Sequence, residues 1–364
     1  QLQLARDALA DGLICKDATP YNVQFVGSRP TFIDVGSFER LQPGQPWVGY
    51  QQFCELFLNP LLLQARTNVS FQPWLRGSVG GITPQDLAAL LGPRNRWRRG
   101  AFTHVALHAR AQRRHAANDR DVPGEMRRAG FGPAIIDAQL KNLTKAVERL
   151  RWKQSDSTWS DYSERSHYTD TDLELKEQFV AEVCGQAPRK LVVDLGANDG
   201  RFSRIAASSA EAVVAVDMDD LVIDRLYRSL REEQNEKILP LTMDLIDSSP
   251  SLGWRGRERP AFFDRAQPDV VLALAVVHHM AIPGTVPPEH IVDWLADMGA
   301  ELVLEVPHAD DPMVEALIRR KRSGVFDHYG LEAFETRLRE RMDVRREVLL
   351  PGGTRTLFHA TPRG

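Results

Sequence analysis

The sequence predicts an α/β fold, in which a domain with a mainly parallel β-sheet follows a β-hairpin and a mostly helical N-terminal region. Three observations lead to this prediction. From about residue 173 onward, helical segments alternate with short apolar strands, an order typical of parallel sheets. A strand, a glycine turn and a helix follow one another directly in "KLVVDLGANDGRFSRIAA", residues 190–207. Residues 47–153 carry apolar residues at three- and four-residue spacing, as amphipathic helices do.

The N-terminal elements follow in order along the chain. Residues 1 to about 45 contain the apolar runs "VQFV" and "TFIDVGSF" between turn-forming residues, which predicts a small β-hairpin. The segments "YQQFCELFLNPLLLQA" and "TPQDLAALLG" then have helical spacing, and Thr83 before Pro84 is a favourable helix start. We therefore assign residues 1–152 to a hairpin and helical region, 153–172 to a polar linker or lid, and 173–364 to the α/β domain.

Composition limits the class of protein. The 364 residues suffice for two domains, and 43% hydrophobic and 26% charged residues are ordinary for a soluble globular protein. Cys15, Cys54 and Cys184 are far apart and odd in number, which favours a reducing, cytoplasmic setting. No apolar run approaches the roughly 20 residues of a membrane span, so we expect no membrane partner. The oligomeric state stays open, as does the question of whether residues precede Gln1.

Charge is distributed unevenly. Residues 1–160 contain 21 Lys and Arg against 13 Asp and Glu, whereas the remaining residues contain 25 against 36. Ten of the arginines lie in residues 94–128. This asymmetry suggests an anionic partner for the first half, although arginine-rich helical surfaces also occur without one.

The glycine turn has an acidic partner on the next strand. The buried-type strand "LVVD" ends at Asp194, and Gly196 and Gly200 permit a tight turn and a close approach of backbone to ligand. The second strand, "AVVAVD", ends at Asp217, where a carboxylate can accept hydrogen bonds from ribose hydroxyls. A glycine turn combined with such an acid indicates an adenosine-binding site.

The residues inside the turn discriminate between cofactors. A dinucleotide site calls for G-x-G-x-x-G, but here Asn198 lies between the glycines and Asp199 adds a carboxylate that opposes a pyrophosphate and suits a cation. The pattern D-x-G-x-N-x-G resembles motif I of the class I S-adenosylmethionine-dependent methyltransferases. Asp244 follows the third strand, where such enzymes bind the adenine amino group, and "PDVVLALAVVHHM" and "ELVLEVP" provide a fourth and a fifth strand.

This resemblance implies a Rossmann-like class I methyltransferase domain with a mainly parallel, seven-stranded type of sheet. It also implies S-adenosylmethionine as cofactor. The residues that would hold it are Asp194, Gly196, Asn198, Gly200, Asp217 and Asp244. Another Rossmann-like domain without methyl transfer is the alternative.

The loop after the fourth strand supplies candidate catalytic residues. Ligands bind beyond the carboxyl ends of parallel strands, where "VVHHM" places His278 and His279. A neutral imidazole there could remove the acceptor's proton or position the acceptor. The alternative is a pair of loop histidines that only satisfy backbone groups.

Aromatic residues of the predicted lid are further candidates. Tyr162 and Tyr168, with Trp159, precede the α/β domain, and their rings and hydroxyls could close over a sulfonium cofactor. Packing between domains is the alternative.

Two polar stretches have weaker signals. Glu305, His308, Asp310 and Asp311 gather at the end of the fifth strand, but they lack a metal-ligand spacing, so we predict no metal site. The loop from Gly253 to Arg265 carries Arg255, Arg257, Arg259 and Trp254, which suit either an anionic substrate or solvent.

The front of the chain has a second pattern. Asp17, Asn22 and Asp34 follow the order of the catalytic loop and metal-binding Asp of the protein-kinase superfamily, which the segment resembles. Only sixteen residues of the sequence precede Asp17, so we expect neither a Gly-rich loop nor a lysine strand for ATP. We interpret the segment as a vestigial kinase-like region used for substrate binding.

Over nearly its full length, the order of motifs resembles a group of bacterial methyltransferases that includes nodulation-protein relatives. We predict methyl transfer from S-adenosylmethionine to an oxygen or nitrogen of a small-molecule metabolite. One alternative is an RNA methyltransferase, suggested by residues 94–128, and another is a non-catalytic cofactor-binding partner protein. The acceptor and the methylated atom stay open.

Overall fold

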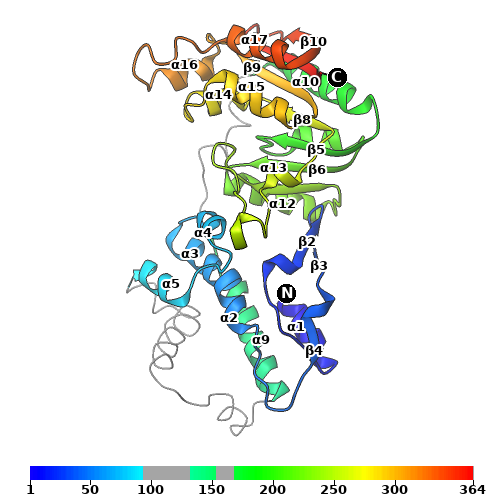
Figure 1. Cartoon of the computed structure of the whole chain (residues 1–364), viewed down its shortest axis with the longest axis vertical. Helices are drawn as coiled ribbons and strands as arrows, with labels where there is room; N and C mark the ends of the chain where they lie inside the picture. The colour runs from blue at the N-terminus through cyan, green and yellow to red at the C-terminus, as the bar shows by residue number, and fades with distance from the viewer. Residues whose placement is uncertain (93–131, 153–167, 364) are drawn as a thin grey trace. The chain divides into compact units, whose positions relative to one another are not determined.

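The computed structural model describes residues 1–92, 132–152 and 168–363. Its internal contacts divide the chain into two compact units (Figure 1). The first comprises residues 1–24, 30–155 and 252–259, and the second comprises residues 25–29, 156–251 and 260–364.

The N-terminal strands include the predicted β-hairpin. After α1 (Leu2–Ala10), β1 (Leu13–Cys15) pairs antiparallel with β4 (Phe38–Arg40), and β2 (Val23–Val26) pairs with β3 (Arg29–Phe32). The 3₁₀ turns η1 (Pro20–Asn22) and η2 (Val35–Ser37) flank the hairpin. Gly27, at the turn between β2 and β3, has φ +55°, which a glycine adopts without strain. The hairpin prediction is confirmed.

Helices dominate the described residues of the first unit after β4. They are α2 (Tyr50–Phe53), the π-helical turn η3 (Cys54–Leu58), α3 (Asn59–Thr67), α4 (Gln72–Gly77), α5 (Pro84–Leu90) and α9 (Pro133–Glu148). Thr83 caps α5 as expected, because its side chain accepts a hydrogen bond from the Asp86 amide at 3.1 Å. The apolar faces of α3, α5 and α9 meet in a core that contains Leu62, Leu87 and Leu140.

A seven-stranded sheet organises the second unit. Its strands are β5 (Arg189–Leu195), β6 (Ala210–Asp217), β7 (Ile238–Thr242), β8 (Val270–Ala273), β9 (Glu301–Pro307), β10 (Met342–Leu349) and β11 (Arg355–Pro362). The order across the sheet is β10-β11-β9-β8-β5-β6-β7, and β11 runs antiparallel to both of its neighbours. The strands β5 to β9 pair in parallel. This arrangement confirms the predicted Rossmann-like, mainly parallel sheet.

Helices cover both faces of this sheet (Figure 1). One core lies between the sheet and α10 (Asp170–Gly185), α11 (Arg201–Ala207) and α12 (Asp220–Glu232). The opposite core involves α14 (Val277–Ala281), α15 (Pro288–Asp297), α16 (Pro312–Ile318) and α17 (Leu331–Arg341). The short η6 (Trp254–Gly256) and α13 (Phe262–Arg265) lie between β7 and β8 in sequence. Because both faces are covered, the central strands read as continuous apolar runs.

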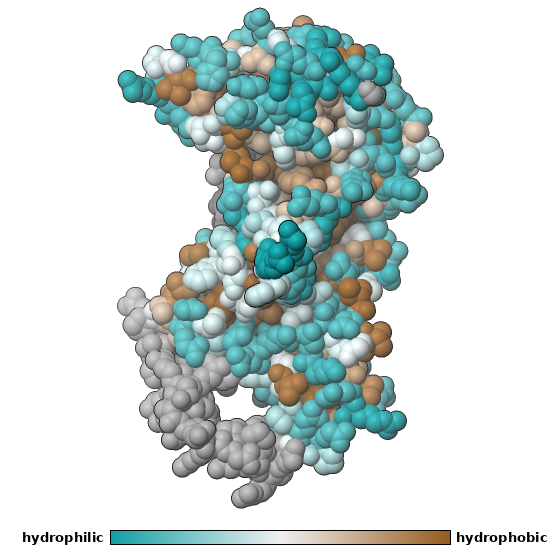
Figure 2. Space-filling model, in the orientation of Figure 1, coloured by the Kyte–Doolittle hydropathy of each residue, from teal (hydrophilic) through white to brown (hydrophobic). Residues whose placement is uncertain are grey.

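One face of the molecule is mainly polar. On the face shown in Figure 2, hydrophilic residues predominate and hydrophobic ones are scattered among them. None of the described helices combines the length and the apolar character that a membrane span requires.

Candidate active site

A cavity opens at the carboxyl ends of the parallel strands, in the second unit. Its volume is about 440 Å³, which is in the range of small-molecule sites. Four predicted cofactor residues and one predicted catalytic residue line it, namely Gly196, Asn198, Asp217, Asp244 and His279. The other lining residues are Met218, Met243, Leu245, Ile246, Leu274, Ala275, Val276, Met280, Pro283 and Gly284.

The turn after β5 depends on its glycines. Gly196 and Gly200 both have φ +77°, a conformation that L side chains rarely adopt. A Cβ atom on Gly196 would lie 3.1 Å from Cγ2 of Val276, and one on Gly200 would lie 2.7 Å from Cδ1 of Leu226. Asn198 has φ +48°, which Asn tolerates better than most residues. The backbone therefore fits closely against the cavity wall at Gly196.

The side chain of Asp217, at the end of β6, is hydrogen-bonded to the turn after β5. One carboxylate oxygen accepts a hydrogen bond from the Asn198 amide and the other from the Asp219 amide, both at 3.0 Å. A carboxylate offers about four acceptor positions, so Asp217 retains capacity for hydroxyl donors of a ligand. Burial raises the pKa of Asp217 above its usual value.

The remaining predicted acids differ in position. Asp244 lines the cavity, and its Oδ1 accepts a hydrogen bond from the Ile246 amide at 2.9 Å. Asp194 is instead 2% exposed beneath the turn, where Ser203 Oγ donates to it at 2.6 Å. Burial raises the pKa of Asp194 to about 6. Asp194 and Gly200 are not among the lining residues, and cofactor binding by either stays a prediction.

The two histidines have different surroundings. His279 lines the cavity, whereas His278 is completely buried. Their ring centroids lie 3.9 Å apart. Burial, assisted by the positive charge of Arg355, lowers the pKa of His279 to about 4. His279 is therefore a neutral imidazole at neutral pH.

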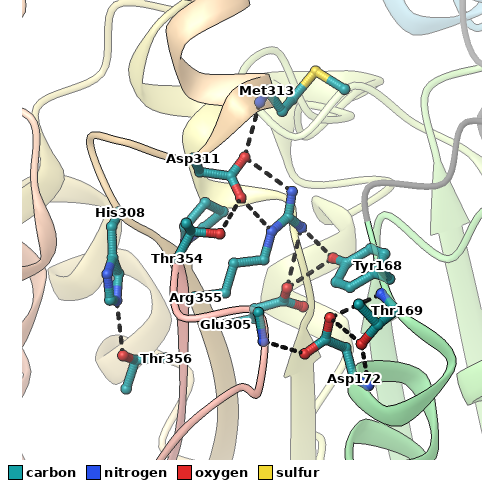
Figure 3. Close-up of polar contacts among 12 residues, drawn as sticks. Tyr168, Thr169, Asp172, Glu305, His308, Asp311, Met313, Thr354, Arg355 and Thr356 are labelled. Carbon is teal, nitrogen blue, oxygen red and sulfur yellow. Dashed lines mark hydrogen bonds and ion pairs between the residues drawn. The ribbon is translucent and has the colours of Figure 1, made fainter.

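Tyr168 belongs to a buried ionic cluster that Figure 3 shows. Its hydroxyl donates to Glu305 Oε1 at 2.7 Å, and the Arg355 guanidinium donates to the same hydroxyl. The charged groups of Lys176 and Arg355 lie 4.0 and 4.4 Å from the centroid of its ring. Tyr168 is not among the residues that line the cavity, and Tyr162 lies outside the described residues. Cofactor binding by either tyrosine stays a prediction.

The carboxylates on β9 and in the loop after it face cations of the protein itself. Glu305 pairs with Lys176 at 2.7 Å, and Asp311 pairs with Arg355 at 2.6 Å. His308 Nε2 lies 2.8 Å from Thr356 Oγ1. Within the described ranges, no three His, Cys, Asp or Glu side chains are arranged to hold a metal ion.

The kinase-like residues are linked through one serine in the first unit. Asn22 Nδ2 donates to Ser37 Oγ at 3.2 Å, and that hydroxyl donates to Asp34 Oδ2 at 2.6 Å. These contacts bring Asn22 and Asp34 together, while the alanine after Asp17 donates its amide to Gln52. A substrate-binding role for them stays a prediction.

Of the two arginine-rich segments, the structure describes the loop from Gly253 to Arg265. The guanidinium of Arg259 stacks over the ring of Tyr21 at 3.4 Å, within the first unit. Residues 94–128 lie outside the described part of the chain.

The sequence did not single out the apolar wall of the cavity. Met218 directly follows Asp217, and Met243 directly precedes Asp244. Adjacency to a predicted site acid was thus the available signal. Met280 in α14 directly follows the predicted His279, so adjacency was a signal there too, whereas nothing comparable marked Gly284 in the turn after α14.

The sheet order and the cavity at its carboxyl edge define a Rossmann-like protein with the class I methyltransferase fold. Nodulation protein NoeA of Rhizobium meliloti (strain 1021) is 36% identical to this chain over 362 residues, which are 98% of this chain and 75% of that relative. The chain belongs to the NoeA family of nodulation proteins. No protein-family model matches it.

Two solved structures are more distant. The N-methyltransferase NodS from Bradyrhizobium japonicum WM9, in complex with S-adenosyl-L-homocysteine, is 14% identical, with 56% of this chain and all of that chain covered and a TM-score of 0.39. Magnesium protoporphyrin IX methyltransferase (ChlM) from Synechocystis PCC 6803 is 17% identical, with 57% and 95% covered and a TM-score of 0.38.

Proposed function

We propose that this chain transfers a methyl group from S-adenosylmethionine to an oxygen or nitrogen of a small-molecule metabolite. One observation carries the proposal: the glycine turn, Asp217 and Asp244 line a single cavity, although they come from three separate strand ends. The three free cysteines suit a reducing, cytoplasmic setting.

The residues present fit this cofactor. A Cβ atom at Gly196 would crowd Val276 at 3.1 Å in a backbone conformation that L side chains rarely adopt. Asp217 keeps acceptor capacity for ribose hydroxyls after binding two backbone amides. Asp244 would hold the adenine amino group, and the apolar side chains of Met218 and Ile246 would contact the ring faces. The carboxylates also suit the positive charge of the ligand.

When bound, S-adenosylmethionine supplies an electrophilic methyl group on a sulfonium sulfur. The acceptor's lone pair forms the new bond as the carbon–sulfur bond breaks, with its electron pair left on sulfur, and the acceptor's proton passes to water. Methyl transfer gains most from the alignment of nucleophile, carbon and sulfur. A histidine with a pKa of about 4 is a weak base at neutral pH, so we assign His279 the role of orienting the acceptor by a hydrogen bond.

Calorimetric titration with S-adenosylhomocysteine tests cofactor binding. Asp217→Asn replaces one carboxylate oxygen by an NH₂ group, at a site where two backbone N–H groups donate. We expect the dissociation constant of the variant for S-adenosylhomocysteine to rise about 10- to 100-fold, as for a lost charged hydrogen bond. Glu211→Gln is the matched control, because Glu211 lies exposed at the other end of the same strand. Absence of binding by the folded wild-type chain would refute the proposal.

Further assays distinguish the proposed function from two alternatives. An RNA methyltransferase would bind RNA with an affinity that falls steeply with salt, so salt-insensitive or absent RNA binding excludes it. A non-catalytic partner protein would keep its biological activity in an Asp217→Ala variant, whereas an enzyme would lose it.

We assign selection of the acceptor to the first unit, on the basis of the helical region that precedes the methyltransferase-type domain.

A further inference from the structure

The first turn of α11 follows the glycine turn without a break. Gly200 is the last residue of the glycine turn, and Arg201 and Phe202 are the first two residues of the helix. Nζ of Lys176, on α10, lies over the Phe202 ring at 5.0 Å from its centroid. A cation at this distance from a ring face is attracted by the π electrons. Lys176 therefore connects α10 to the segment that the proposed function assigns to the cofactor.

The contact between Lys176 and Phe202 is shielded from solvent. Lys176 is 2% exposed, and Phe202 packs, partly buried, against the core between the sheet and α10. Cation–π attraction is stronger where water is kept away from the cation. By contrast, the ion pair of Arg201 with Glu177 at 3.0 Å has side chains that are 48% and 40% exposed, and exposed pairs contribute little. The lysine is thus the stronger of these two links from α10 to α11.

The ammonium of Lys176 is held in place from its other side. Its Nζ lies 2.7 Å from Glu305 Oε2, on β9, and 4.0 Å from the centroid of the Tyr168 ring. Glu305 is completely buried, so withdrawing the cation from it would leave a buried carboxylate short of countercharge. The ammonium is therefore a fixed point against which the Phe202 ring can rest.

The charge of Lys176 also acts beneath the glycine turn. Burial raises the pKa of Asp194 to about 6, and the positive charge of Lys176 works in the opposite direction. Asp194 belongs to β5, two residues before Gly196, and accepts a hydrogen bond from Ser203 Oγ of α11 at 2.6 Å. The same lysine thus contacts the helix after the turn and favours the ionised carboxylate before it.

We propose, on the basis of the methyltransferase function above, that Lys176 is a positioning residue for the cofactor. It acts through the ring of Phe202, which rests on its ammonium, and so it fixes the first turn of α11 and the backbone from Gly196 to Gly200. Lys176 is not among the described residues that line the cavity, so its effect on cofactor binding is indirect.

Replacement of the ring, with the pair of Lys176 and Glu305 left in place, tests this inference. Phe202→Leu keeps an apolar side chain and removes the π face. We expect its dissociation constant for S-adenosylhomocysteine, measured by calorimetry on the folded full chain, to rise about fivefold, as for one lost cation–π contact. Phe202→Tyr keeps the π face, and its dissociation constant should stay within about twofold of the wild type.

Phe179→Leu is the matched control. The ring of Phe179 packs in the same core and also lies near a cation, since Cζ of Arg346 is 4.6 Å from its centroid, but that arginine belongs to β10. Because Phe179 is completely buried, we expect this variant to lose at least as much resistance to urea as Phe202→Leu. Its dissociation constant should equal that of the wild type, because a structural loss alone leaves the affinity of the folded protein unchanged.

A variant of the lysine tests whether the two residues act together. Lys176→Met removes the cation, and we expect the double variant with Phe202→Leu to bind S-adenosylhomocysteine no more weakly than Lys176→Met does, because both changes remove one contact. Urea unfolding establishes whether Lys176→Met folds, since it also unpairs Glu305. Where it does not fold, the variants of Phe202 decide.

The outcomes are separable. The inference is overturned if Phe202→Leu binds S-adenosylhomocysteine as tightly as the wild type, or if Phe202→Tyr or Phe179→Leu weakens binding as much as Phe202→Leu. Strictly additive losses in the double variant also overturn it. Failure of the wild type to bind S-adenosylhomocysteine at all refutes the methyltransferase proposal instead.

Discussion

Asp194 is a residue whose charge opposes stability. It is fully enclosed at the end of β5, with Ser203 Oγ as hydrogen-bond donor, and burial raises its pKa from 3.8 to about 6. Because the folded-state pKa is raised, this carboxyl destabilises the fold as the pH rises from about 4 to about 6. The full effect above pH 6 is on the order of 3 kcal/mol.

Asp194→Asn removes this ionisation and keeps an oxygen that can accept from Ser203. At pH 7.5 without ligand, we expect the free energy of unfolding of the variant to exceed that of the wild type by up to about 3 kcal/mol. At pH 4 we expect the two free energies of unfolding to be nearly equal. Urea unfolding at the two pH values measures this difference. An equal difference at both pH values would contradict the assignment to ionisation. Weaker binding of S-adenosylhomocysteine should accompany the gain in stability.

His279 should stay neutral throughout the physiological range. Burial lowers its pKa to about 4, so its contribution to stability is present above pH 6.5 and is lost as the pH falls toward 4. We expect NMR titration of the histidine rings to show no protonation of His279 between pH 5.5 and 8.5. A transition near pH 6.5, absent from His279→Gln, would show that this imidazole is a proton acceptor instead.

At the scale of elements, a buried ionic cluster connects α10 with β9 and β11 (Figure 3). Asp172 in the first turn of α10 accepts from the amides of Thr169 and Gly352, both at 2.9 Å. Glu305 on β9 receives Lys176 from α10 and Arg355 from β11. Because these groups are buried, each charge depends on its partner.

Removing one partner from this cluster should be strongly destabilising. We expect Lys176→Met and Glu305→Gln each to lower the free energy of unfolding by about 3–5 kcal/mol, and the double variant to cost less than their sum. Glu182→Gln on the same helix removes an exposed ion pair with Arg346 and should cost less than about 1 kcal/mol. Denaturant unfolding of the four variants measures these values, and strict additivity would indicate that the pair is not coupled.

At the scale of the whole molecule, cofactor binding should leave a signature confined to one unit. All lining residues of the cavity belong to the second unit. With S-adenosylhomocysteine at 100 times its dissociation constant, we expect hydrogen exchange of residues 196–200, 243–246 and 275–284 to slow by up to about 100-fold. The helices α3 and α9 of the first unit should be unaffected. Equal protection of both units would contradict this localisation.

Much of the architecture could be predicted from local patterns. The strand, glycine turn and helix at residues 190–207 occur as predicted, because apolar runs and glycines act over a few residues. Asp217 and Asp244 could be placed at strand ends for the same reason, since parallel strands bring their carboxyl ends to one edge. The distinction between His278 and His279 could not be predicted, because consecutive helical residues point about 100° apart and only packing decides which is buried.

The sequence by itself determined the class of fold, the glycine turn and the acids beside it, since each depends on periodicity or on backbone preferences of single residues. Only the tertiary structure decided where Tyr168 lies, because its hydrogen bond to Glu305 joins residues 137 positions apart. It also decided the polarity of the cavity, whose wall combines residues from several strand ends. Contacts between distant segments depend on how the elements pack, and local sequence patterns do not predict that packing.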